Sequence, residues 1–219
     1  MQALFKNFFA SIPIGTRVLV LIFLLTFPLQ VIGTKMEMFN FYGWFGLRSD
    51  LVWSGHAWRV LTFGLLPAGP ADWLFGGFWL ATLASIFGRN WRSLEFWGYC
   101  LLGNLGGAIP VVALRPDSAM LVVGSGSMIF ALLVAWDSFF RYERLLLLGI
   151  GEMSVRQAAI LLGIANSVIV FFSCGGWFMM VSMWGGGVAG WLYLFIRRKL
   201  VMGKTGRQVG SERISRLEL

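Results

Sequence analysis

The sequence predicts an all-α protein, a polytopic membrane bundle with six transmembrane helices. Of its 219 residues, 58% are hydrophobic and 13% are charged, and the mean hydropathy is +0.75, which is far from the composition of an ordinary soluble chain. Six apolar stretches each approach the ~20 residues with which a helix crosses a ~30 Å hydrocarbon core. These stretches cover residues 16–33, 71–87, 94–114, 119–139, 155–172 and 177–196.

The distribution of basic residues predicts the orientation of the bundle, because Lys and Arg are retained on the cytoplasmic side of a membrane. We expect a cytoplasmic N-terminus at residues 1–15, a membrane domain at 16–198 with an outer loop at 35–68, and a basic cytoplasmic tail at 199–219. Of the 18 basic residues, four then lie outside: Lys35, Arg48, Arg59 and Arg115. The formal charge of +8 therefore reflects topology and contact with the lipid bilayer, and we expect no nucleic-acid partner.

The N-terminal region predicts a span that is kept in the mature protein. No small-residue cleavage site follows the first apolar stretch, which is long enough to cross the membrane. The chain also shows no mitochondrial or plastid targeting stretch and is short. We therefore expect an integral protein of a prokaryotic inner (plasma) membrane, with both termini in the cytoplasm.

Small residues recur every four positions in three of the spans. They are Gly103 and Gly107 in the third, Ser127, Ala131 and Ala135 in the fourth, and Gly186 and Gly190 in the sixth. Such faces let backbones approach closely where lipid supplies no hydrophobic driving force between helices. The pattern predicts close crossings of these spans. Counted at 1.5 Å per residue, positions 126 and 183 lie at a similar depth, on the order of 10 Å below the outer surface.

Four segments resemble parts of the rhomboid family of intramembrane serine proteases. Residues 123–133 read Val-Gly-Ser-Gly-Ser-Met-Ile-Phe-Ala-Leu-Leu, beside the Gly-x-Ser-Gly helix of rhomboids. Residues 183–190 read Met-Trp-Gly-Gly-Gly-Val-Ala-Gly, beside His-x-Gly-Gly-x-x-x-Gly. A Trp-Arg-x-x-Thr segment, shared with the derlins, implies a structural loop motif formed by Trp58, Arg59 and Thr62. Glu95 precedes Gly98 as at the family's turn into the third span.

The resemblance implies a rhomboid-like six-helix fold in which the catalytic positions are degenerate. Gly126 stands where the family has its nucleophilic serine, and Met183 stands where it has the basic histidine. Asp72 and Gly76 stand where a His and an Asn stabilise the oxyanion. An aspartate would repel an oxyanion, and a glycine has no side chain to donate a hydrogen bond.

The fallback nucleophiles are Ser125 and Ser127, and each would need a base within hydrogen-bond reach. The single histidine, His56, lies in the outer loop, and the sixth span offers no Lys, Asp or Glu at that depth. We therefore expect no serine-type endopeptidase activity. An active rhomboid that uses Ser127 or Ser125 is the first alternative. A small-solute transporter that depends on Asn104 or Asn166 is the second, disfavoured because the spans offer no clear mid-bilayer charge.

The predicted function is that of a pseudoprotease, a multi-pass membrane protein that binds the transmembrane segments of client proteins. Rhomboid substrates enter laterally near the second and fifth spans, which implies a client cavity at that place. The residues that we assign to this cavity are Ser125, Gly126, Ser127, Asn166, Met183 and Trp184. We expect no cofactor and no metal site, because Cys100 and Cys174 lack metal-ligand spacing and neighbouring histidines.

Overall fold

The computed structural model describes residues 13–36, 39–147, 151–173 and 177–217, and it is mostly helical, at 79%. In chain order the elements are α2 (Ile14–Lys35), α3 (Phe41–Phe45), α4 (Ser49–Trp53), α5 (Arg59–Thr62), the 3-10 helix η1 (Phe63–Leu65), the π-helix η2 (Asp72–Gly76), α6 (Gly77–Asn90), α7 (Ser93–Leu114), α8 (Gly126–Phe140), β1 (Arg144–Leu147), β2 (Gly151–Ser154), α9 (Val155–Ser173) and α10 (Trp177–Leu217). Each of the six apolar stretches therefore contains a helix.

Three of these helices are long and apolar enough to cross a membrane. They are α2, α7 and the Trp177–Lys199 part of α10. Helix α8 and the Val155–Val168 part of α9 are shorter apolar helices, and η2 with α6 covers the second predicted span. Within the described residues, length and composition thus identify three candidate spans rather than six.

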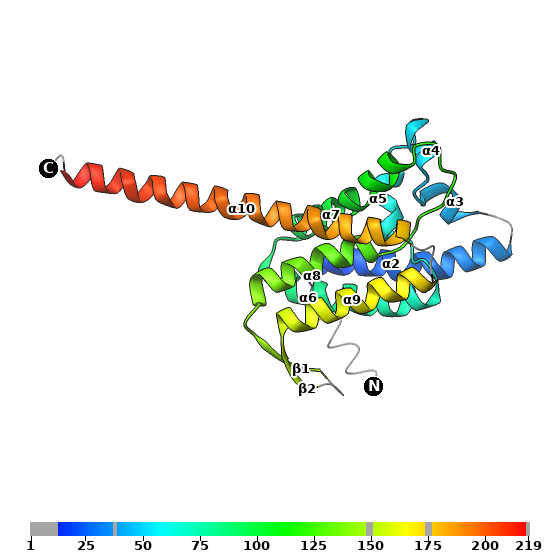
Figure 1. Cartoon of the computed structure of the whole chain (residues 1–219), viewed down its shortest axis with the longest axis horizontal. Helices are drawn as coiled ribbons and strands as arrows, with labels where there is room; N and C mark the ends of the chain where they lie inside the picture. The colour runs from blue at the N-terminus through cyan, green and yellow to red at the C-terminus, as the bar shows by residue number, and fades with distance from the viewer. Residues whose placement is uncertain (1–12, 37–38, 148–150, 174–176, 218–219) are drawn as a thin grey trace.

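Helices α7, α8 and α10 form the centre of the bundle, because each of them packs against the other two. Helix α2 packs against α6 and α7, and α9 lies on α8 and α10. Figure 1 shows α3, α4 and α5 gathered at one end of the bundle, which we call the loop end. Strands β1 and β2 lie at the opposite end, the hairpin end, beyond which α10 projects as a single helix (Figure 1).

The fourth predicted span becomes helical only at Gly126, so the helix predicted over residues 119–125 is wrong. Val122 instead forms an antiparallel bridge with Leu47, with N–H to O distances of 2.9 Å and 2.8 Å in the two directions. Gly124, at φ 134°, then turns the chain into α8, a conformation that a residue with a side chain rarely adopts. Such irregular backbone is tolerated at membrane depth where protein buries it, and Val122 is 2% exposed.

The loop end is tied together by the Trp-Arg-x-x-Thr segment of α5. Arg59 is buried, and its guanidinium donates from Nη1 to the Gly46 carbonyl and from Nη2 to the Gly43 carbonyl, both at 2.8 Å. The Thr62 hydroxyl and the Trp58 indole N–H donate to further carbonyls of α3, at 2.7 Å and 3.4 Å. All three residues therefore hold α5 against α3.

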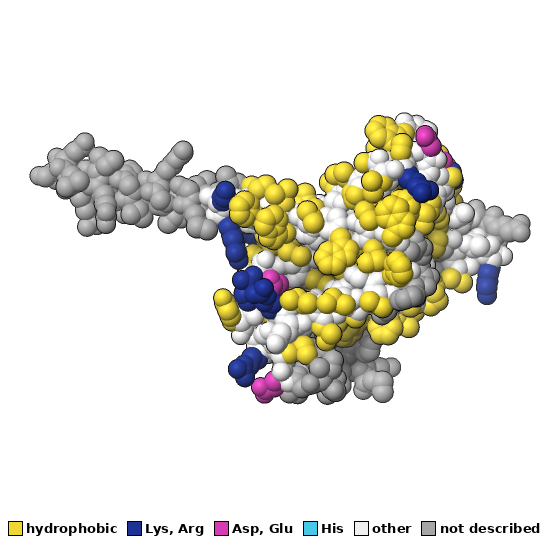
Figure 2. Space-filling model, viewed as in Figure 1, with side chains coloured by type: hydrophobic (Ala, Val, Ile, Leu, Met, Phe, Trp, Pro, Cys, Tyr) yellow, Lys and Arg dark blue, Asp and Glu magenta, His cyan; other side chains and the backbone are white. Residues whose placement is uncertain are grey.

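The hairpin end carries charged side chains. Strands β1 and β2 form an antiparallel hairpin that the sequence did not predict, and it joins α8 to α9. Arg197 of α10 pairs with Glu95 of α7 at 2.7 Å and lies over the Trp91 ring, while Arg141 pairs with Asp137 at 3.2 Å. Figure 2 shows Lys and Arg side chains gathered near this end, whereas the flank of the bundle is largely hydrophobic.

Candidate functional site

The two degenerate dyad positions, Gly126 and Met183, lie against each other inside the bundle. A Cβ atom added to Gly126 would lie 2.6 Å from Met183 Cγ and 3.2 Å from Met183 Sδ. Met183 is buried, with 3% of its surface exposed. The methionine side chain therefore fills the space into which a side chain at position 126 would project.

Glycines of α10 bring its backbone onto that of α8. A Cβ atom on Gly186 would lie 2.8 Å from the Cα and carbonyl carbon of Ser127. One on Gly190 would lie 3.0 Å from Ala131 Cα. Distances this short leave no room for a side chain, so these two helices pack through their backbones.

Glycines of α7 approach α8 in the same way. A Cβ atom on Gly103 would lie 2.9 Å from Ala131 Cβ, and one on Gly107 would lie 2.6 Å from Ser127 Cβ. Ala135, one turn further along α8, is fully buried. We call the contact surface of α7, α8 and α10 the glycine seam, and it is defined by Gly103, Gly107, Gly186 and Gly190.

Ser125 is hydrogen-bonded to the carboxylate of Asp72, which lies on η2 and not on the sixth span, where the sequence offers no basic partner. Its Oγ donates to Asp72 Oδ1 at 2.7 Å, and its backbone N–H donates to Asp72 Oδ2 at 3.2 Å. The Ala68 N–H donates to the same Oδ2 at 2.9 Å. A Cβ atom on Gly76 would lie 2.5 Å from Ser125 Oγ. Ser125 is fully buried and does not line the cavity described below, and its hydrogen bonds to Asp72 fix the start of α8.

Ser127 is also engaged in a buried hydrogen bond. Its Oγ donates to Asn104 Oδ1 at 3.0 Å, and Asn104 Nδ2 donates onward to the Leu61 carbonyl at 3.1 Å. Asn104 is fully buried and Ser127 is 2% exposed. Because buried polar groups need partners, this chain of hydrogen bonds gives both residues a structural role between α8, α7 and the loop end.

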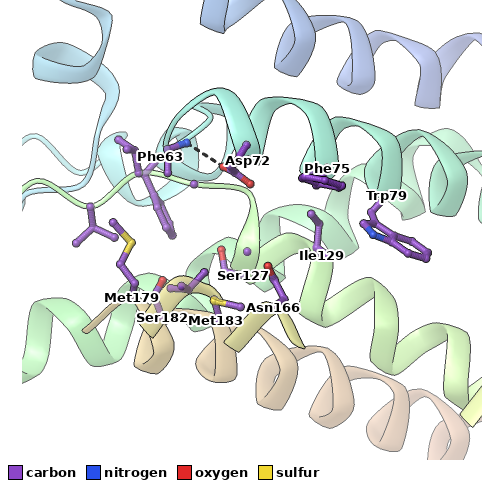
Figure 3. A pocket seen from close by; sticks show the side chains of 18 of the residues that line it. Phe63, Asp72, Phe75, Trp79, Ser127, Ile129, Asn166, Met179, Ser182 and Met183 are labelled. Atoms are coloured by element: carbon purple, nitrogen blue, oxygen red, sulfur yellow. Dashed lines mark hydrogen bonds between the residues drawn. The ribbon is translucent and has the colours of Figure 1, made fainter. Parts of the chain in front are cut away.

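A cavity of about 160 Å³ lies beside the degenerate dyad positions. Residues of η2 and α6 form one wall (Figure 3), and residues of α8, α9 and α10 complete the lining. The cavity thus lies between the second and fifth apolar helices. Its polar lining comes from Asp72, Ser127, Asn166 and Ser182, and its aromatic lining comes from Phe63, Phe75 and Trp79.

Large apolar side chains flank this cavity on the surface of the bundle. Phe75, which lines the cavity, is 69% exposed, and Phe78, three residues further along, is 60% exposed, while Leu162 of α9 is half buried in the lining. Among the described residues, nothing accepts or donates a hydrogen bond to the half-buried side chain of Asn166. The cavity therefore combines apolar lips with polar groups deeper inside, the pattern of a ligand site.

The structure brings together four of the six residues that we assigned to the client cavity. Gly126, Ser127, Asn166 and Met183 line it. Trp184 does not, because it is half exposed and packs against the Phe130 ring, with centroids 5.7 Å apart. Successive residues of a helix point about 100° apart, which turns Trp184 away from the cavity that its neighbour lines.

Sequence reasoning missed the aromatic wall of the cavity. Phe75 and Trp79 follow Asp72 at spacings of three and seven residues, which places all three on one face of a helix. That spacing was visible in the sequence and could have identified them. Ser182, which directly precedes Met183, was also missed.

The chemistry available at the cavity is limited. His56 lies at the loop end, with Nδ1 3.2 Å from the Leu51 carbonyl and its ring edge-on to Trp58. No group of three His, Cys, Asp or Glu side chains that could hold a metal occurs in the part of the chain that the structure describes. Cys100 is fully buried, and Cys174 lies outside the described residues.

The fold and the cavity define a polytopic helical membrane protein with a half-open site between two of its apolar helices. Residues 16–210 match the family model described as eukaryotic integral membrane protein (DUF1751). The chain belongs to this family, which is rhomboid-like and whose function is not known. No curated protein matches the chain.

The family corrects the expected location. A prokaryotic inner membrane is wrong, because the family is eukaryotic. The expectation rested on the short length of the chain and on finding no mitochondrial or plastid targeting stretch. The patterns that indicate a membrane protein, helix length and the bias of basic residues, apply in prokaryotic and eukaryotic membranes alike. These patterns indicate a membrane protein and do not distinguish the two kinds of cell.

Proposed function

We propose that this protein is a six-span rhomboid-like pseudoprotease that binds the transmembrane helices of client membrane proteins. The observation that carries the proposal is the contact between Gly126 and Met183 at the wall of the cavity. The rhomboid resemblance assigns the nucleophile and the base to these two positions. A glycine and a methionine in contact there can neither attack a peptide bond nor accept a proton.

The shape of the cavity supports a helix as the ligand. A volume of about 160 Å³ is too small for a helix, whose diameter with side chains is about 10 Å. A client helix would instead rest on Phe75 and Phe78 of η2 and α6 and on Leu162 of α9, and insert one or two side chains into the cavity. Packing and hydrogen bonds, which drive helix association in lipid, are available on those two surfaces.

The six-span topology rests on the same features. Helix α8 has 15 residues and is about 22 Å long, which is shorter than the ~30 Å hydrocarbon core. The buried extended segment around Val122 precedes it and lengthens the crossing. Helix α9, with 19 residues, and η2 with α6 supply the remaining two spans.

Photo-crosslinking of a model client tests the proposal. A photoreactive amino acid would replace Phe75 or Leu162, on the two sides of the cavity, in protein reconstituted with a helix-destabilised transmembrane peptide. Matched controls would place it at Leu25 or Val188, which are exposed on α2 and α10. We expect intact peptide to be trapped at the first two positions at several times the control yield. Equal yields at all four positions would contradict client binding in the cavity.

The absence of proteolysis needs its own test, because Ser125 does have a carboxylate partner. The same peptide and a fluorophosphonate probe would be incubated with the protein and with the Ser125→Ala and Ser127→Ala variants. We expect neither cleavage nor labelling in any sample. Labelling that one substitution abolishes would identify a nucleophile and overturn the pseudoprotease assignment.

A further inference from the structure

Asp72 differs from the other helical carboxylates whose side chains the structure describes. Asp50 pairs with Arg48, Glu95 with Arg197 at 2.7 Å, and Asp137 with Arg141 at 3.2 Å. Asp72 has no Lys, Arg or His partner within 4.0 Å among the residues whose side chains are described. Its negative charge is met only by neutral hydrogen-bond donors.

The position of Asp72 along the bundle makes a carboxylate without a cationic partner unusual. The indole of the next residue, Trp73, donates to the Leu24 carbonyl of α2 at 2.9 Å and stacks on Phe27. Leu24 lies eleven residues before Lys35, the last residue of α2, and this corresponds to roughly 16 Å along the helix. The exposed side chains of α2 near this level, Leu25 and Leu29, are apolar. Asp72 therefore lies beside the apolar middle of α2, where its carboxylate has apolar neighbours on that side.

The carboxylate also has capacity for one more donor. A carboxylate offers about four acceptor sites. Three are occupied, by the N–H of Ala68 and by the N–H and O–H of Ser125. Asp72 is half buried and lines the cavity, where Figure 3 shows it on the wall formed by η2.

We propose that the cavity selects client helices that carry a lysine or arginine at the level of Asp72, and that this cation pairs with the carboxylate. This inference rests on the proposed function, because it names the client class for the same site. A basic side chain inside a membrane is costly unless it finds an opposite charge. Phe75 and Ile129 line the same cavity and would contact the apolar stem of a lysine, and Asn166 and Ser182 add polar groups to this lining.

Model peptides can test this selection directly. Leucine-rich transmembrane peptides would carry Lys, Gln or Leu at the same central position, and two further peptides would carry the Lys two turns toward either end. They would be reconstituted in phosphatidylcholine, which has no primary amine to compete. Affinity would be measured by titrating the yield of crosslinks from a photoreactive residue at position 75. We expect the best-placed Lys peptide to bind at least tenfold more tightly than the Gln peptide.

The Asp72→Asn substitution removes the negative charge of the side chain and keeps its shape. The amide oxygen can accept from the two backbone N–H groups, and the amide N–H₂ can donate to Ser125 Oγ. We expect Asp72→Asn to abolish the preference for the Lys peptide over the Gln peptide. Asp117→Asn, which removes an exposed carboxylate in the segment after α7, is the control and should keep the full preference.

The outcomes separate this inference from the proposed function. Equal binding of the Lys, Gln and Leu peptides by the wild-type protein would overturn charge selection and leave client binding intact. A preference for Lys that survives Asp72→Asn would also overturn it. Peptide yields no higher than those from a probe at Val188 would overturn both proposals. If Asp72→Asn fails to fold, the comparison of Lys with Gln on the wild-type protein still decides the question.

Discussion

The two sides of α8 are built in opposite ways. On the glycine seam, four glycines bring the backbones of α7, α8 and α10 so close that an added Cβ would overlap a neighbour. On the cavity side, Phe75, Trp79 and Leu162 line a cavity of about 160 Å³. One face of the helix is closed by backbone contact, and the other stays half open.

The difference shows what holds each side together. Lipid is as apolar as a leucine side chain, so the seam depends on close packing. The cavity side depends on hydrogen bonds from Asp72 to Ala68 and Ser125, which fix η2 against the start of α8. Gly126 lies at the boundary between the glycine seam and the cavity, since it lines the cavity and contacts Met183. A site kept open in this way can receive a ligand without loosening the bundle.

The largest loss of stability is expected for Gly186→Ala, which adds a methyl group to the glycine seam. The new Cβ would lie 2.8 Å from the Ser127 backbone, which cannot rotate away as a side chain could. Overpacking of this kind costs about 1–3 kcal/mol, and we expect the upper end of that range. Thermal unfolding of the purified protein in detergent, followed by tryptophan fluorescence, would measure the loss.

Gly187→Ala is the matched control for this prediction. An added Cβ at Gly187 meets Phe130 at an ordinary 3.7 Å, and alanine favours helix over glycine by up to about 1 kcal/mol. We expect unchanged or slightly raised stability. Similar melting temperatures for Gly186→Ala and Gly187→Ala would show that the seam tolerates expansion and would remove the contrast between the two sides.

The next effect is expected on the cavity side, for Asp72→Ala. The substitution leaves the N–H groups of Ala68 and Ser125 without their acceptor, and an unsatisfied buried donor costs about 1–3 kcal/mol. We expect a loss of about 2 kcal/mol. Ser125→Ala removes one hydrogen bond and should cost about 1 kcal/mol.

A double-mutant cycle identifies the link between these two residues. Because Ser125 Oγ donates to Asp72, the loss in the double variant should be smaller than the two single losses added together. Unfolding midpoints of the four proteins supply the coupling. Strict additivity would mean that the hydrogen bond contributes nothing to the cavity wall.

A smaller effect is expected at Gly126, where the seam and the cavity meet. Gly126→Ser places its Cβ against Met183 Cγ and should cost about 1–2 kcal/mol. Met183→Ala alone opens a hole, yet in the double variant the serine can occupy part of it. We expect Met183→Ala to cost less in the Gly126→Ser background than in the wild-type protein, as measured by melting temperature. If Met183→Ala cost more in the Gly126→Ser background than in the wild-type protein, the two side chains would not be in contact.

The sequence predicted the seam more completely than the cavity. Glycine spacing is a local property, so the repeats at Gly103, Gly107, Gly186 and Gly190 are legible without a structure. The Asp72 to Ser125 hydrogen bond joins residues 53 positions apart, and no local pattern encodes it. The aromatic wall could have been predicted from the sequence, because Phe75 and Trp79 share the helical face of Asp72.

The error at the start of α8 has a different cause. Residues 119–125 are mostly small or apolar, and hydropathy does not distinguish a helix from an extended strand buried in protein. The extended form is fixed by Leu47, which supplies both backbone hydrogen bonds to Val122 from a distant loop. The hairpin between α8 and α9 was missed because its two strands are only four residues long, and Arg-Leu-Leu-Leu in the first does not show the alternation that predicts a strand.

The smallest effect is expected for Tyr42→Phe, which tests how the loop end supports the cavity. The Tyr42 hydroxyl donates to the Pro67 carbonyl, next to the segment in which Ala68 binds Asp72. Its loss should cost about 1 kcal/mol at neutral pH. Burial raises the pKa of Tyr42, and the negative charge of Asp72 raises it further.

The sign of the pH dependence follows from that shift. A pKa that is higher in the folded protein than the unfolded value of about 10 stabilises the fold fully below about pH 10, and this stability is lost as the pH rises through the folded value. In melting curves recorded from pH 8 to pH 11, the melting temperature of the wild-type protein should therefore approach that of Tyr42→Phe as the pH rises. Tyr142→Phe, at an exposed position of the hairpin end, is the control and should parallel the wild-type curve. A constant gap between wild type and Tyr42→Phe would mean that the phenol does not help to hold the segment that presents Asp72 to the cavity.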